Sequence, residues 1–109
     1  MNKQQIEYYN QKVEKSILRL PAGLLARFLR LTELIEEFGP NLGMPHTRAL
    51  GDKLFELRLK SKEGIGRIFY CSKIGGRIII LHSFIKKTQK MPKKELEIAK
   101  KRLKEALKK

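Results

Sequence analysis

Two hydrophobic patterns alternate along the chain, one with the spacing of helices and one with the spacing of strands. Residues 22–38 carry apolar side chains three or four positions apart, and Gly39-Pro40 follows directly. This stripe predicts an amphipathic helix that ends before the glycine. A shorter stripe from Val13 to Leu20 stops at Pro21, so the two segments predict a helical hairpin with one apolar face.

Three strand patterns follow one another in the second half of the chain. Residues 54–60 alternate between apolar and charged side chains, which predicts a half-buried strand with a charged open face. Residues 65–72 alternate as well, and Gly75-Gly76 is typical of a hairpin turn. Residues 78–81 are all apolar and mostly β-branched, as in a strand buried on both faces. These segments predict an antiparallel meander.

The remaining segments complete an α+β fold. Residues 6–9 predict a short first strand, and residues 93–107 predict a helix with an apolar stripe and lysines on its other faces. Residues 41–53 show little periodicity, so we expect an irregular connection with at most one helical turn. We predict one small domain over residues 1–109. Its N-terminal strand and helical hairpin pack on a mainly antiparallel sheet of three to four strands, and its C-terminal helix is basic.

Charge changes this picture more than any other property of the composition. The chain of 109 residues has a net charge of +14, although 41% hydrophobic residues suffice for a core. From Lys86 to Lys109 there are eleven Lys and Arg against three Glu, so this segment alone contributes +8. Such an excess indicates a nucleic acid or an acidic protein as partner.

The chain lacks the signals of an exported or membrane protein. Cys71 is the single cysteine and cannot form an internal disulfide, which is typical of a reducing compartment. No apolar stretch is long enough for a transmembrane helix, and the first residues lack the apolar core of a signal peptide. We therefore expect a cytoplasmic protein without a membrane partner.

Metal and cofactor chemistry find little support in the sequence. Asp52 is the only aspartate, and His46 and His82 lie 36 positions apart outside any ligand motif. The segment Gly64-Ile65-Gly66 is too short for a phosphate-binding loop. We expect neither a metal site nor a cofactor, and we expect His46 to be a solvated loop residue.

Cations remain as the candidate functional groups. A meander would bring together, on one face or end of the sheet, the side chains of Arg58, Arg67, His82, Lys86 and Lys87. Such a set can clamp a phosphate and stabilise the negative charge of a transition state. RNA carries its own nucleophile, the 2′-hydroxyl group, so cations and an acid–base pair could cleave it without a metal. Arginine suits charge stabilisation, whereas lysine or histidine can transfer protons.

The position of Arg67 can be predicted from alternation. It shares a face with Phe69 and Cys71, opposite to Ile68 and Tyr70, so we expect it to be exposed on an open face beside Arg58. A purely structural role is the alternative for both arginines. Arg58 would then pair with Glu56 or Glu63, and Arg67 would form a salt bridge on the sheet face.

Three segments carry a resemblance to a known family. They are Leu54-Phe55-Glu56-Leu57-Arg58, then Gly66-Arg67-Ile68-Phe69-Tyr70, then the run from Leu81 to Lys90 with Pro92. Together with the order of the predicted elements, they resemble the phage-derived branch of HigB toxins, within the RelE/ParE toxin superfamily. The Phe-x-Lys-Lys-Thr-x-Lys segment that begins at Phe84 is the most specific part.

This resemblance implies a toxin that cleaves mRNA on the ribosome and is held inactive by a helix-turn-helix antitoxin of the HigA type. Arg67 matches the strand arginine that RelE-like toxins use at the scissile phosphate, and Arg58 matches the basic position on the preceding strand. Lys86 and Lys87 fall where such enzymes place further basic groups. RelE has a catalytic tyrosine in its C-terminal segment, whereas this chain has none after Tyr70, which leaves His82 or a lysine for proton transfer.

Outside that cluster, cations of the open strand face and the C-terminal segment are expected to bind the RNA backbone: Lys60, Lys90, Lys93 and Lys94. Two other function classes stay open. One is a ParE-like toxin that inhibits DNA gyrase, which needs no phosphate clamp. The other is a non-catalytic RNA-binding module of the same fold, for which an aromatic content of 7% offers few surfaces for base stacking.

Overall fold

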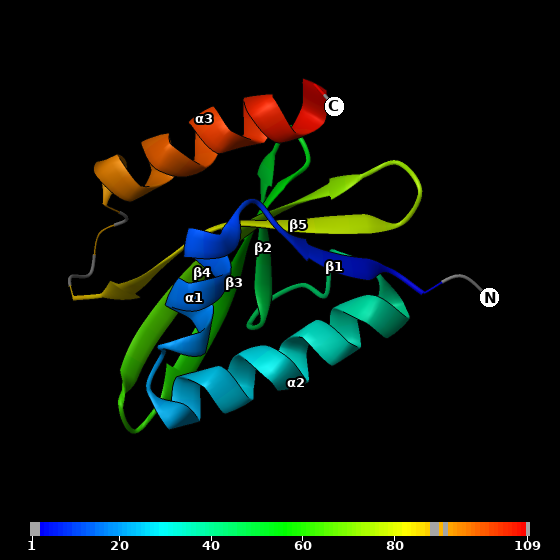
Figure 1. Ribbon diagram of the computed structural model, residues 1–109. Helices are drawn as coiled ribbons and strands as arrows, with labels where there is room; N and C mark the ends of the chain where they lie inside the picture. Colours follow the sequence, from blue (N-terminus) through cyan, green and yellow to red (C-terminus); the bar gives the residue numbers. More distant parts are fainter. Residues whose placement is uncertain (1–2, 88–89, 91, 109) are drawn as a thin grey trace.

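A mixed five-stranded sheet with helices on both of its faces forms the protein (Figure 1). The computed structural model describes residues 3–87, 90 and 92–108. In chain order the elements are β1 (Gln5–Tyr8), α1 (Gln11–Leu18), α2 (Ala22–Phe38), β2 (Thr47–Gly51), β3 (Leu54–Ser61), β4 (Gly64–Lys73), β5 (Arg77–Lys86) and α3 (Lys93–Lys108). The strands lie in the order β1-β5-β4-β3-β2, and only β1 runs parallel to its neighbour. The predicted α+β class, helical hairpin and meander are confirmed.

The sheet has more strands than the predicted three to four, because residues 41–53 were wrongly expected to be irregular. Thr47–Gly51 forms the edge strand β2, which pairs antiparallel with β3. Short edge strands are held by pairing with a neighbour more than by their own hydrophobic pattern. Thr47 is buried and its Oγ1 accepts a hydrogen bond from the Gly43 N–H at 2.9 Å, which ties the preceding loop to the strand.

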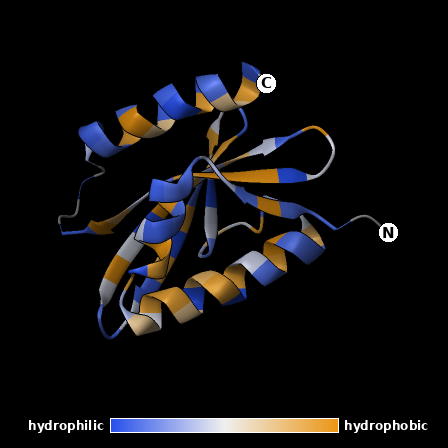
Figure 2. Ribbon diagram, in the orientation of Figure 1, coloured by the Kyte–Doolittle hydropathy of each residue, from blue (hydrophilic) through white to orange (hydrophobic). Residues whose placement is uncertain are grey.

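Two hydrophobic cores lie on the two faces of the sheet. On one face, α1 and α2 pack against the strands through a core that includes Ile17, Phe28 and Tyr70. On the other face, α3 covers Phe69 and its neighbours with the small side chains of Ala99 and Ala106 and with Leu103. Figure 2 shows the contrast between the largely hydrophobic α2 and the largely hydrophilic α3. The β3–β4 face that we predicted to be open is therefore partly covered by α3.

A bulge in β5 decides which of its side chains face α3. Tyr70 of β4 pairs with Ile80, whereas Phe69 pairs with His82, so β5 has one extra residue at Leu81. Ile79 and Leu81 belong to the core under α3, and Phe84 packs against the same core beyond the bulge. The bulge thus places two successive residues, Leu81 and His82, on the α3 face.

No helix in the part of the chain that the structure describes is long and apolar enough to cross a membrane.

Candidate active site

The β3–β4–β5 register brings four of the predicted cations together on the α3 face of the sheet. Arg58 lies directly opposite Arg67, and Arg67 lies opposite Phe84. In the next row of the sheet, Lys60 lies opposite Ile65, which in turn lies opposite Lys86. Directly opposed residues on neighbouring strands have Cβ atoms about 4.5–5.5 Å apart. The sheet therefore holds Arg58, Arg67, Lys60 and Lys86 in two adjacent rows.

Arg67 is buried rather than exposed as predicted, with only 5% of its surface accessible. Its Nε lies 3.7 Å from Oε1 of Glu56, and its Nη1 donates a hydrogen bond to the Gly66 carbonyl at 3.2 Å. Alternation identified the correct face of the strand but not the side chains that cover it. The alternative that Arg67 forms a salt bridge on the sheet face is thus supported. This structural role does not exclude a role in catalysis.

Burial lowers the pKa of the Arg67 guanidinium below its ordinary value. The Glu56 carboxylate opposes this change in pKa, and the positive charge of Arg58 adds to it. The group still carries its full charge near neutral pH, because arginine is not deprotonated in proteins. A charged, desolvated and fixed guanidinium is the kind of donor that stabilises a developing oxyanion most strongly.

Glu56 is the acidic residue that sequence reasoning did not place in the site. Its side chain is 3% exposed, and within the described residues its Oε2 has no hydrogen-bond partner. The strand pattern put Glu56 on the same face as Arg58, but burial by neighbouring strands could not be read from that pattern. Its contact with Arg67 helps to hold the guanidinium in place.

The structural alternative for Arg58 is not supported. Glu56 pairs with Arg67, and Glu63 accepts a hydrogen bond from the Gly23 N–H at the start of α2. The Arg58 Nη1 instead donates to the Met44 Sδ at 3.4 Å. A thioether is a weak acceptor, so this contact leaves the positive charge of Arg58 uncompensated.

His82 lies on the same face but is held by α3. Its Nε2 is 3.1 Å from Oε1 of Glu95, and its ring lies 6.1 Å from that of Phe84. Its side chain is 16% exposed. This contact joins β5 to the first turn of α3, so His82 has a structural role whether or not it also transfers a proton.

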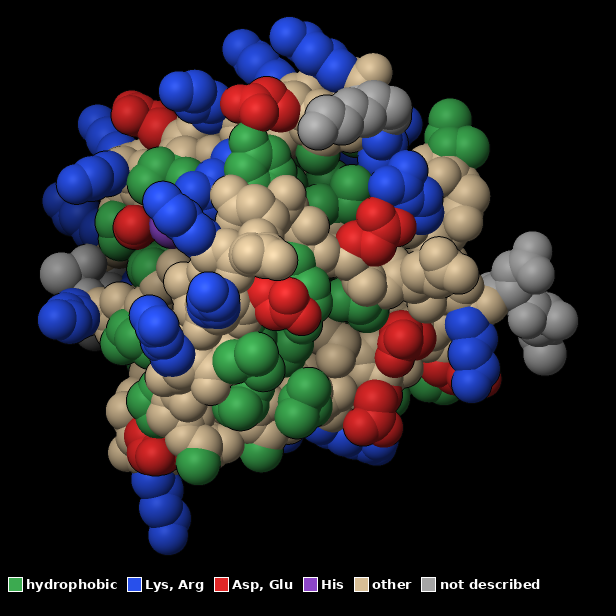
Figure 3. All heavy atoms as spheres, viewed as in Figure 1, with side chains coloured by type: hydrophobic (Ala, Val, Ile, Leu, Met, Phe, Trp, Pro, Cys, Tyr) green, Lys and Arg blue, Asp and Glu red, His purple; other side chains and the backbone are tan. Residues whose placement is uncertain are grey.

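Lys87, the fifth residue of the predicted catalytic set, and the three remaining predicted RNA-binding lysines lie around the end of β5 and the start of α3. Lys87 is exposed directly after β5, Lys90 is exposed in the connection, and Lys93 and Lys94 are exposed in the first turn of α3. The His82–Glu95 contact holds this turn of α3 against the strand. Figure 3 shows Lys and Arg side chains gathered over α3 and along the adjoining side of the molecule. Cationic side chains thus border the α3 face on this side.

A hollow of about 360 Å³ opens beside the arginine pair at the edge of β3. Arg58, Arg67 and Lys60 line it together with three residues from outside the meander, Arg27 of α2 and Pro45 and His46 of the loop before β2. Sequence reasoning treated His46 as a solvated loop residue and did not consider Arg27. The helical pattern shows only that Arg27 lies off the apolar stripe, so their proximity to the site is a tertiary feature.

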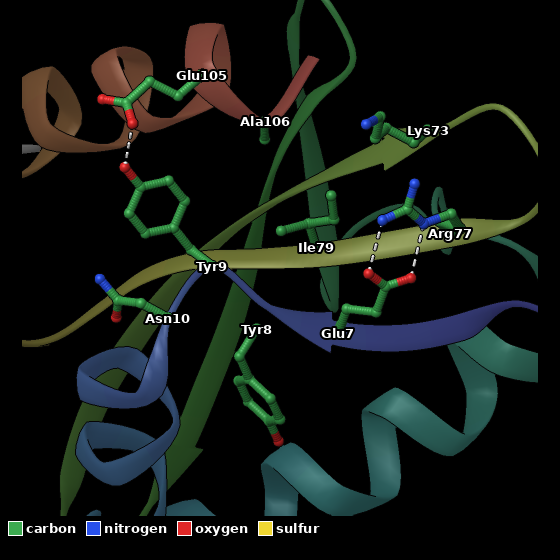
Figure 4. A pocket seen from close by; sticks show the side chains of 9 residues that line it. All are labelled: Glu7, Tyr8, Tyr9, Asn10, Lys73, Arg77, Ile79, Glu105 and Ala106. Atoms are coloured by element: carbon green, nitrogen blue, oxygen red, sulfur yellow. Dashed lines mark hydrogen bonds and ion pairs between the residues drawn. The ribbon is translucent and has the colours of Figure 1, made fainter. Parts of the chain in front are cut away.

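A second hollow of about 400 Å³, between β1, β5 and the end of α3, has a different character (Figure 4). Arg77 makes two hydrogen bonds to Glu7, of 2.7 and 2.8 Å, and Tyr9 donates to Glu105 at 2.6 Å. Through its hydrogen bond, Arg77 lowers the pKa of Glu7. These charges are paired within the protein. The hollow is therefore better explained as a packing contact between β1, β5 and α3 than as an anion-binding site.

In the described part of the chain, no group of three His, Cys, Asp or Glu side chains lies close enough to hold a metal ion. The chemical character of the α3 face comes instead from guanidinium and ammonium groups around one buried carboxylate.

A family model described as phage derived protein Gp49-like matches residues 15–104. The chain belongs to this family. The Gp49-like family lies within the RelE/HigB-like toxin superfamily, so the predicted superfamily is confirmed, whereas the HigB branch stays a prediction. Membership in the Gp49-like family is consistent with the toxin of a toxin–antitoxin pair. No curated protein matches the chain.

Proposed function

We propose that this Gp49-like protein is a HigB-like toxin that cleaves mRNA on the ribosome through attack of a ribose 2′-hydroxyl on the adjacent phosphate. The observation that supports this best is the direct pairing of Arg58 with Arg67 on neighbouring strands. Two guanidinium groups side by side repel one another, and an anion between them relieves that repulsion. A phosphate group matches their hydrogen-bond geometry.

In this mechanism the 2′-oxygen forms a bond to phosphorus while the bond from phosphorus to the 5′-oxygen breaks. Arg67, fixed by burial and by Glu56, stabilises the charge on the phosphorane, and Arg58 binds a non-bridging oxygen. The 2′-hydroxyl loses a proton and the leaving 5′-oxygen gains one. Lys86 or His82, both on this face, would transfer these protons.

The proposed partners follow from the same charges. A net charge of +14 favours association with ribosomal RNA, and it also favours an antitoxin with an acidic segment. We propose a HigA-type helix-turn-helix protein as this antitoxin. Co-expression with the antitoxin should relieve growth arrest and yield a complex that co-purifies.

Cleavage can be tested with purified ribosomes that hold a defined mRNA. We expect cleavage within the mRNA, products that end in a 2′,3′-cyclic phosphate or a 3′-phosphate, and no cleavage where the attacking ribose carries a 2′-O-methyl group. Free RNA, where it is cut, should still be cut in EDTA, because no step uses a metal. Products with a 3′-hydroxyl end would exclude the mechanism. Inhibition of DNA gyrase without RNA cleavage would replace it with the ParE-like function.

A further inference from the structure

The cationic face does not stop at the edge of the meander. Pairing between β2 and β3 ends where the Arg58 N–H donates to the His46 carbonyl, whereas β3 stays paired with β4 as far as Ser61 and Gly64. The hollow of about 360 Å³ lies at this edge, and its lining includes Arg27 of α2, which belongs to the opposite layer. The hollow thus connects the face that carries Arg58 and Arg67 with the helical hairpin.

The charges around this hollow are not balanced by nearby carboxylates. Its lining contains four cations and His46 but no acidic residue. The two neighbouring carboxylates are engaged, Glu56 with Arg67 and Glu63 with the Gly23 N–H. No ion pair joins Arg27, Arg58 or Lys60 to a carboxylate within the described residues. Unbalanced like charges around a concave surface raise the local positive potential and favour an anionic ligand.

We propose that this edge hollow binds the phosphate and base of a nucleotide next to the scissile phosphate, with Arg27 as a phosphate-binding residue. This inference rests on the proposed function, since it extends the same site. The RNA strand would run from the Arg58–Arg67 pair over the edge of β3 toward α2. Pro45 and Ile65 supply apolar surface in the hollow, against which a base can lie.

The observations favour a single RNA strand over an acidic peptide. A single RNA strand carries one phosphate per nucleotide, and four cations line this one hollow: Arg67, Arg58, Lys60 and Arg27. The volume of the hollow lies within the range of about 300–1,000 Å³ that is usual for sites of small ligands. Because the side chain of Arg27 is exposed, it can contact a phosphate without unfolding any part of the protein.

The test measures binding of a short single-stranded RNA with 2′-O-methyl riboses, which cannot be cleaved, to the full-length chain over a range of salt concentrations. Arg27→Gln should reduce the slope of log K against log salt by about 0.7, the contribution of one phosphate contact in a single strand. A single contact with this slope strengthens RNA binding about eightfold when the salt concentration falls from 1 M to 50 mM. The affinity of the variant relative to the unmodified protein should therefore be about eightfold lower at 50 mM salt than at 1 M. Arg27→Lys keeps the charge and should restore most of the slope.

Arg30→Gln is the matched control, because Arg30 lies on the same helix, is 63% exposed and pairs with Glu33 at 3.9 Å. It should leave the slope unchanged. Equal effects of the two substitutions, or none from Arg27→Gln, would show that Arg27 adds only diffuse charge, while the proposed cleavage would stand. A loss of antitoxin affinity in Arg27→Gln with an unchanged RNA slope would assign the hollow to an acidic peptide. Absence of salt-dependent RNA binding by the unmodified protein would overturn the proposed nucleotide site, whereas the proposed function would fall only if mRNA on ribosomes also stayed uncut.

Discussion

Replacement of Arg67 by methionine should separate the two roles that the structure gives this residue. Methionine keeps much of the length of the side chain but removes the charge, so Glu56 would stay buried without its cation. Removal of one partner of a buried ion pair destabilises a protein by about 3–5 kcal/mol. For a chain of this size, that loss lowers the melting temperature by about 12–25 °C.

A second substitution, Glu56→Gln, removes the charge that Arg67→Met leaves behind. We expect the double variant to regain much of the lost stability, with a coupling energy toward the upper end of the range of about 0.5–3 kcal/mol that is usual for residues in contact. Both Arg67 variants should nevertheless lose about 10²–10³ in cleavage rate, the usual effect of removing a preorganised donor to a transition-state anion. Stability is measured by urea unfolding, and cleavage on ribosomes at a temperature where every variant is folded.

Two outcomes would refute this reasoning. If Arg67→Met alone changed the free energy of unfolding by less than about 1 kcal/mol, the Arg67–Glu56 contact would not act as a buried ion pair. If the stable double variant cleaved mRNA as fast as the unmodified protein, Arg67 would be a structural residue only. Arg67→Lys offers a further comparison, because it retains the charge but loses the fixed guanidinium plane.

Three further predictions concern other parts of the structure. Lys86→Gln should reduce the cleavage rate, whereas the matched substitution Lys108→Gln at the far end of α3 should not, as measured with the same mRNA on ribosomes. Glu7→Gln should reduce the stability measured by denaturant unfolding above the ordinary Glu pKa of 4.5, because Arg77 lowers the pKa of Glu7 in the folded state. The difference in stability between the variant and the unmodified protein should vanish as the pH falls through that lowered pKa. A difference that grows in acid would contradict the assignment. Burial raises the pKa of the Cys71 thiol, so an alkylating reagent should modify it only after unfolding, and rapid labelling of the native protein would count against the buried position.

Local sequence signals predicted most of the fold. The helix over residues 22–38 was predicted with its observed bounds, because an apolar stripe and the Gly39-Pro40 end signal agree. The strand β2 was missed because its residues are mostly exposed and it is held at the sheet edge by pairing with β3. Its position depends on contacts between segments, which no local pattern contains.

The candidate site could be predicted only in part for a similar reason. Alternation and strand order placed Arg58 and Arg67 on one face, and the register confirms that they are opposed. The burial of Arg67 depends on Glu56 and on packing across three strands, so alternation could not predict it. Arg27 and His46 join the site through the docking of α2 and of a loop, to which their own surroundings in the sequence give no clue.

The bulge at Leu81 shifts the alternation of side chains along β5 by one residue. Before it, odd-numbered residues of β5 face α3; beyond it, the even-numbered residues His82, Phe84 and Lys86 do so. Deletion of this one residue would restore regular alternation and leave His82, Phe84 and Lys86 facing α3, with the loss of the buried Leu81 side chain from the core as its main cost. An insertion or deletion elsewhere in the strand would need a second, compensating change to keep Lys86 beside Arg67. Among relatives of this protein, a one-residue difference in the length of this strand should consequently fall at the position of Leu81.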